Sequence, residues 1–247
     1  MPRWKLVLSY DGTRYNGWQR QPTGRTVEGE IERCLETLYQ QPIDLIGQGR
    51  TDAGVHALHQ VAHFDLPDTL SPDRFLNGLQ SLLPDDIAMV GTEEVEETFH
   101  ARFDAVSRSY IYSCTTARRP LQRHMEWYIP NQPDVLLLNR CAEAVLGRYD
   151  FINFCIPPEG EKATTICEIV QSEWVQEGES LTYHIEGNRF LRHLVRRLVG
   201  TMMQVATGAL TLEEFTTRIT GPEISQKGHA APPHGLLLSG VRYPITP

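Results

Sequence analysis

Strand and helix signals intermingle along this chain without the regular strand-helix rhythm of a doubly wound parallel sheet. Alternating apolar residues predict a strand over 4–10, and apolar residues at helical spacing predict helices after the caps Thr26 and Ser71. The same patterns predict strands at 43–46, 60–65, 87–90 and 109–115, a helix at 135–146, a hairpin over 166–185, helices at 189–205 and 212–219, and a strand at 236–241. This mixture predicts an α+β fold with a largely antiparallel sheet.

The length of the chain allows one large domain or two modest ones. It has 247 residues, of which 40% are hydrophobic, and we favour two halves that share one core. No segment approaches the roughly 18 uncharged apolar residues that a membrane span needs, and no targeting segment is visible at the start. We therefore expect a cytoplasmic protein without a membrane partner.

Charge and cysteine usage argue against a surface that is basic throughout, a disulfide framework and a thiolate zinc site. The formal net charge of −8 argues against a surface that is basic throughout, so any contact with nucleic acid must come from a local basic patch. The five cysteines are scattered and contain no Cys-x-x-Cys pair. They indicate neither a disulfide framework nor a thiolate zinc site.

The densest cluster of small and polar residues runs from Gly47 to Ala57, directly after a short apolar strand. Two interpretations are about equally good on chemistry alone. In one, Asp52 bonds its own backbone in a turn whose glycines supply positive φ; in the other, the segment is a functional loop. The cluster completes no phosphate-binding glycine pattern.

The string Gly49-Arg50-Thr51-Asp52-Ala53-Gly54-Val55-His56-Ala57 resembles the signature of the TruA-type tRNA pseudouridine synthases, with Asp52 at the position of their catalytic aspartate. Small departures from the family pattern are Gln48 for alanine, Tyr149 for histidine and Leu194 for methionine. The resemblance covers nearly the full chain, because further motifs match in order: Tyr10-Asp11-Gly12-Thr13, Gly17-Trp18-Gln19, Gln60-Val61 with His63-Phe64, Phe99-His100-Ala101-Arg102, Arg108-x-Tyr110-x-Tyr112, Asp150-Phe151, Phe190-Leu191 with Val195-Arg196, and Gly235-Leu236.

The resemblance implies the pseudouridine synthase fold, in which two ferredoxin-like halves share a largely antiparallel sheet with the active-site cleft between them. We place the division near Ala105. Residues 1–105 would then carry the catalytic aspartate loop, and residues 106–247 the base-stacking tyrosine and an arginine-rich helix. The resemblance also implies a homodimer that isomerises uridine to pseudouridine at positions 38, 39 and 40 of the tRNA anticodon stem-loop.

The implied reaction breaks the bond from ribose C1′ to uracil N1 and rejoins the base through C5, with nothing oxidised, reduced or lost. It needs a carboxylate near C1′ and C6 but no cofactor and no metal. By resemblance Asp52 supplies that carboxylate and Arg196 pairs with it, which would favour its ionised form. Tyr110 would stack on the flipped-out uracil.

Arginines are the candidates for RNA contact. Arg189, Arg192 and Arg196 are spaced i, i+3 and i+7, which on the expected helix gives a positive strip opposite the leucines. A solvated helix face is the alternative without the family pattern. Arg50 could reach RNA phosphate or form a structural salt bridge. Weaker candidates flank the Gly17-Trp18 loop: Arg14, Arg20 and Arg25.

Two other functions stay open from the residues. A metal-dependent hydrolase would use His56, His59 and His63, whose spacing aligns three imidazoles on a helix. The alternation over 60–65 indicates a strand instead, which leaves only two of them on one face. A non-catalytic tRNA-binding module would need the basic strip, but a buried carboxylate facing it would repel phosphate.

Overall fold

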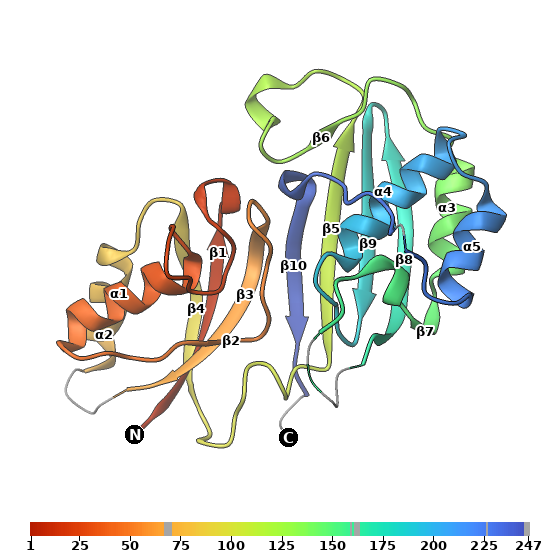
Figure 1. The fold of residues 1–247 in the computed structure, drawn as a ribbon. Coiled ribbons are helices and arrows are strands. Elements are labelled where there is room, and N and C mark those ends of the chain that lie inside the picture. The colour runs from red at the N-terminus through yellow and green to blue at the C-terminus, as the bar shows by residue number, and fades with distance from the viewer. Residues whose placement is uncertain (67–70, 159, 161–163, 226, 245–247) are drawn as a thin grey trace. The chain divides into compact units, whose positions relative to one another are not determined.

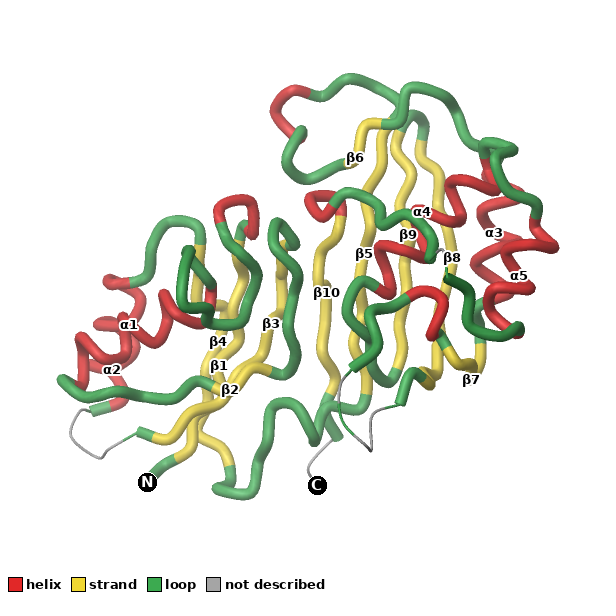
Figure 2. The backbone as a smooth tube through the Cα atoms, in the orientation of Figure 1, coloured by secondary structure: helices red, strands yellow, loops and turns green. Residues whose placement is uncertain are grey.

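The computed structural model describes residues 1–66, 71–158, 160, 164–225 and 227–244. The chain forms two compact units. The first contains Met1–Val106 and the described residues from Leu238 onward, and the second contains Ser107–Leu237. Figures 1 and 2 show the elements of each unit.

The first unit consists of strand, helix, two strands, helix and strand. These are β1 (Arg3–Tyr10), α1 (Val27–Tyr39), β2 (Ile46–Gly47), β3 (His56–Asp65), α2 (Pro72–Leu82) and β4 (Ile87–Val95). The strands lie in the order β4-β1-β3-β2, and each neighbouring pair is antiparallel. This element order and this strand order define a ferredoxin-like unit.

Both helices of the first unit lie on the same side of its strands (Figure 1). Phe75 of α2 packs on Trp4 of β1 and on Phe64 of β3, with ring centroids 5.4 Å and 5.9 Å apart. Val27, Ile31 and Leu35 are fully buried on α1, at the spacing that the sequence predicts. One apolar layer between helices and strands therefore forms the core of this unit.

Local signals explain where these helices begin and end. The Thr26 side chain accepts the Gly29 N–H and caps α1, as expected. Helix α1 ends at Tyr39, before Pro42, because Gln40 adopts the left-handed conformation with φ 56°. Pro72 occupies the first turn of α2 and Ser71 precedes it, although the Ser71 hydroxyl makes no capping hydrogen bond in the described chain.

The second unit also mixes strands and helices. Its elements are β5 (Ser107–Thr115), β6 (Trp127–Tyr128), α3 (Val135–Ala144), β7 (Gly147–Asp150), β8 (Ile166–Glu177), β9 (Ser180–Gly187), α4 (Leu194–Ala206) and α5 (Leu212–Thr220). The last strand, β10 (Leu236–Arg242), contains residues of both units. Strands β5, β9, β8 and β7 are neighbours in that order and antiparallel, and the short β6 runs parallel to β5. The expected fold class, α+β with largely antiparallel strands, is confirmed.

Trp174 of β8 ties the helices of the second unit to its strands. Its indole N–H donates to the Met202 sulfur of α4, and its backbone N–H donates to Asn139 of α3. The indole also stacks on Tyr183 of β9 at 5.0 Å.

None of the helices in the described ranges has the length and apolarity that crossing a membrane requires.

The helix expected over 189–205 is wrong at its start, since α4 begins at Leu194. The backbone before it bonds elsewhere: Asn188 N–H donates to Glu168 C=O, and Arg192 C=O accepts the Ile156 N–H, both at 3.0 Å. His193 then adopts a left-handed conformation with φ 68°, which a continuous helix does not allow. The helical strip of Arg189, Arg192 and Arg196 is therefore wrong as well.

Candidate active site

The loop that carries Asp52 is packed against the segment 12–18 at distances that only glycine allows. A Cβ atom on Gly12 would lie 2.0 Å from Val55 O, and one on Gly17 would lie 2.6 Å from Thr51 O. Gly17 also has a φ of 91°, which disfavours any residue with a side chain. The glycines of two neighbouring motifs thus serve one loop that is distant from them in the sequence.

Hydrogen bonds fix this loop on both sides of Asp52. Trp18 N–H donates to Thr51 C=O at 3.1 Å, and Gly54 N–H donates to Tyr15 C=O at 3.3 Å. The Thr51 hydroxyl is 2.8 Å from the Tyr10 hydroxyl. Asp52 contributes its backbone carbonyl to a turn by accepting the Val55 N–H, and its side chain is half-buried. The segment around Asp52 therefore contains a turn, and this turn is compatible with a functional loop, so the two interpretations of the sequence do not conflict.

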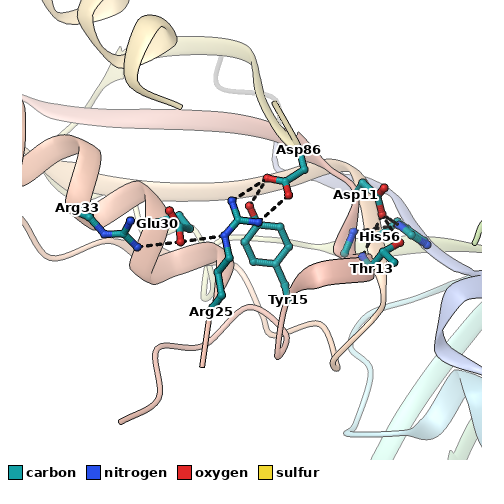
Figure 3. Close-up of polar contacts among 9 residues, drawn as sticks. Asp11, Thr13, Tyr15, Arg25, Glu30, Arg33, His56 and Asp86 are labelled. Atoms are coloured by element: carbon teal, nitrogen blue, oxygen red, sulfur yellow. Dashed lines mark hydrogen bonds and ion pairs between the residues drawn. The ribbon is translucent and has the colours of Figure 1, made fainter. Parts of the chain in front are cut away.

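Figure 3 shows a cluster of ion pairs next to this loop. The Arg25 guanidinium donates two hydrogen bonds to Asp86, at 2.7 Å and 3.0 Å, and stacks over the Tyr15 ring at 4.4 Å. Its Nε also donates to Glu30 at 3.0 Å. Burial opposes ionisation of Asp86, but hydrogen bonds from Arg25 and Tyr15 outweigh it and lower the pKa of this carboxyl.

Arg25 therefore serves the structure of the first unit through Asp86 and Glu30, and its contact with RNA stays a prediction. Arg20 is similar in part, because its guanidinium lies 3.2 Å from Glu32, although its side chain is 72% exposed. An exposed pair of this kind adds little stability.

The three histidines of the hydrolase hypothesis have separate surroundings. His56 is buried, and its Nδ1 lies 3.0 Å from Gly12 N and 3.1 Å from Asp11 Oδ1 (Figure 3). His63 accepts the Ala101 N–H, and burial lowers its pKa to about 4. His59 is exposed. In the described part of the chain, no three His, Cys, Asp or Glu side chains gather as metal ligands would.

Gln48, where the sequence departs from the family's usual alanine, makes a buried amide pair. Its Nε2 donates to Gln60 Oε1 at 3.0 Å, and Gln60 in turn donates to Gly49 C=O at 3.1 Å. Both side chains are at most 3% exposed. The substitution therefore adds polar contacts beneath the loop at the amino-terminal side of Asp52.

The second unit holds the other residues singled out from the sequence. Tyr110 lies on β5 opposite Ile185 of β9, is half-buried, and meets the Phe190 ring edge-on at 5.1 Å. Tyr112, two residues along, is fully buried and donates its hydroxyl to Pro232 C=O at 2.8 Å. Tyr110 is thus the more accessible of the two tyrosines in this motif.

The arginines differ in setting. Arg196, in the first turn of α4, is half-buried; its Nε donates to Ala231 C=O at 2.8 Å, and its own C=O accepts the Ala231 N–H at 2.9 Å. Arg192 is exposed and Arg189 is half-buried, both before the helix. Arg50 is exposed in the first unit; burial raises the pKa of Glu28, and the charge of Arg50 opposes this rise in part.

The sequence reasoning missed Trp18 and Glu28, which support the Asp52 loop, and it missed the separate ion-pair cluster around Asp86. The Gly17-Trp18-Gln19 motif was a usable signal, because a glycine in a loop indicates a positive φ or a close approach, and Gly17 has both. Asp86 gave no local signal, since its partner Arg25 is distant in sequence.

Comparison with known proteins identifies the family. The chain matches the family model described as tRNA pseudouridine synthase over residues 6–104 and 141–244. It is 40% identical to the tRNA pseudouridine synthase A of Bacteroides thetaiotaomicron, over 99% of this chain and 91% of that protein. Proteins of the same name from Exiguobacterium sp. and Parabacteroides distasonis are 35% and 38% identical, over at least 98% of this chain and 97% of theirs.

The chain belongs to the tRNA pseudouridine synthase family. It is accordingly an isomerase that converts uridine to pseudouridine in tRNA, and the resemblance found in the motifs is confirmed.

Proposed function

We propose that the protein isomerises the uridines at positions 38, 39 and 40 of the tRNA anticodon stem-loop, with Asp52 as the catalytic carboxylate. The observation that supports this role of Asp52 is the set of contacts that hold its loop in place. Backbone bonds to Trp18 and Tyr15 hold the residues on either side of it, and two glycines allow the close approach. A site held so closely is what catalysis by positioning requires.

The chemistry assigns a task to each proposed residue. The C1′–N1 bond of uridine breaks, the uracil turns, and a C1′–C5 bond forms; C5 then loses its proton and N1 gains one. Asp52 acts as nucleophile or base in this sequence. Arg196 pairs with the carboxylate, and Tyr110 stacks on the uracil, which must leave the RNA stack to be reached.

Exposed arginines supply the proposed RNA contacts. Arg50 and Arg192 are exposed and Arg189 is half-buried, so their guanidinium groups are available to phosphates. Local contacts of this kind suit a protein whose net charge is −8.

We also propose that the protein acts in the cytoplasm as a homodimer, as implied for the TruA type that its motifs resemble. Light scattering checks the homodimer, with twice the chain's 28.1 kDa as the expected mass.

The test maps pseudouridine at nucleotide resolution in unmodified tRNA transcripts, with chelator present and no cofactor added. Wild type, Asp52→Asn and the control Asp44→Asn are compared, because Asp44 is exposed and lies before the loop. We expect product at positions 38 to 40 from wild type and control, and none from Asp52→Asn, which should still bind tRNA. Product from Asp52→Asn would remove that residue from the centre of the reaction, and product only at other positions would refute the target site.

A further inference from the structure

We propose that Glu28 is a positioning residue for the reaction: it fixes the Trp18 side chain, and Trp18 holds the backbone that carries Asp52. The inference rests on the proposed catalytic role of Asp52. Glu28 itself is assigned no contact with the RNA.

Glu28 is a buried carboxylate that accepts hydrogen bonds from three successive residues. Trp18 donates its indole N–H at 3.1 Å, Gln19 its side-chain amide at 3.0 Å, and Arg20 its backbone N–H at 2.7 Å. Only 7% of Glu28 is exposed. Both carboxylate oxygens are therefore used to hold the segment that follows Gly17.

Trp18 transmits this constraint to the Asp52 loop at two points. Its backbone N–H donates to Thr51 C=O at 3.1 Å, directly before Asp52. Its indole lies so close to Gly47 that a Cβ atom there would be 2.6 Å from Nε1. With 1% of its surface exposed, Trp18 is enclosed between the start of the loop and the residue before Asp52.

The backbone of α1 holds the same segment. Val27 N–H donates to Gly17 C=O at 3.2 Å, and Glu28 N–H donates to Trp18 C=O at 3.0 Å. Glu28 thus binds Trp18 through both its main chain and its side chain. A change in the carboxylate leaves the main-chain bond intact, so the side-chain contribution can be tested separately.

Burying a carboxylate costs free energy, so a buried carboxylate such as Glu28 indicates that its hydrogen bonds matter to the protein. Burial raises the pKa of Glu28, and the Arg20 backbone N–H, the Trp18 N–H and the nearby charge of Arg50 offset this only in part. Its place in the first turn of α1 also favours the anion. Glutamine would fit the same volume, but its amide would turn an N–H group toward one of the donors.

The test compares Glu28→Gln with Glu30→Gln. Glu30 is also buried on α1, but it pairs with Arg25 at 3.0 Å and Arg33 at 2.8 Å and so serves as the matched control (Figure 3). In steady-state assays on tRNA, Glu28→Gln should lower kcat about tenfold or more and change KM less than about twofold. Glu30→Gln should lose thermal stability to a similar extent and keep the wild-type kcat.

A second variant covers the case in which Glu28→Gln fails to fold. Trp18→Phe keeps a buried ring and removes the N–H donor, so kcat should fall while KM is kept. An unchanged kcat in Glu28→Gln or Trp18→Phe, or equal losses of kcat in Glu28→Gln and Glu30→Gln, would overturn the inference. Asp52→Asn is assayed alongside: if it is inactive while Glu28→Gln is fully active, only the role of Glu28 is lost, whereas an active Asp52→Asn removes the proposed site itself.

Discussion

Asp86, the residue before β4, binds the side chains of Arg25 and Tyr15 next to the loop that carries Asp52. A carboxylate with two charged hydrogen bonds from one guanidinium forms a strong and directional pair. Its removal would leave Arg25 with Glu30 as the remaining carboxylate drawn in this cluster (Figure 3).

We expect Asp86→Asn to lower the free energy of unfolding at neutral pH by about 1 to 3 kcal/mol. The folded-state pKa of Asp86 is lowered, so its stabilisation is present above the unfolded-state pKa and is lost as the pH falls through the folded-state value. Urea unfolding of both proteins at about pH 7 and about pH 3 measures this. The difference between them should shrink at the lower pH; a difference independent of pH would contradict the linkage.

At the scale of the element, helix α4 depends on a glycine that permits close packing. A Cβ atom on Gly200 would lie 2.1 Å from His229 O, and this backbone carbonyl cannot rotate away as a side chain could. Gly78 of α2 differs, because its Cβ would meet Leu38 Cδ2, the end of a flexible side chain, at 2.6 Å.

The two glycines therefore predict opposite results for the same substitution. Gly200→Ala should destabilise the protein by about 1 to 3 kcal/mol, since overpacking outweighs the gain in helix propensity. Gly78→Ala should be neutral or stabilise by up to about 1 kcal/mol. Thermal unfolding of both variants is the measurement, and an equally stable Gly200→Ala protein would show that the His229 segment can move.

The elements that the sequence predicted well are those specified by neighbouring residues. Thr26 caps α1 through a hydrogen bond to Gly29, three residues away, so the start of that helix could be read locally. The start of α4 could not, because Asn188 and Arg192 bond to Glu168 and Ile156, which are distant in sequence. The same holds for the candidate site. The motif around Asp52 was visible in the sequence, but the contacts by which Glu28 and Trp18 hold the Asp52 loop form only in the fold.

At the scale of the whole molecule, a net charge of −8 must be reconciled with a polyanionic substrate. General attraction to RNA is weak for such a surface, so a few specific contacts should account for the salt dependence of binding.

The slope of log K against log salt concentration is negative, and replacement of the exposed Arg192 by alanine should reduce its magnitude by about 0.7 to 0.9, the loss of one phosphate contact. Arg74→Ala is the control, because Arg74 is exposed on α2 and is assigned no contact with RNA. Filter binding of tRNA over a range of salt concentrations measures both slopes. Equal slopes for Arg192→Ala and wild type would exclude a phosphate contact by Arg192.

The closing residues of the described chain belong to the first unit. Arg242 C=O accepts the Val106 N–H, the Tyr243 hydroxyl donates to Ala101 C=O, and the Tyr243 ring lies 5.2 Å from that of Phe99. During synthesis these partners emerge from the ribosome far apart in time. The first unit therefore stays without these contacts until Arg242 and Tyr243 have been translated, which happens after the whole of the second unit.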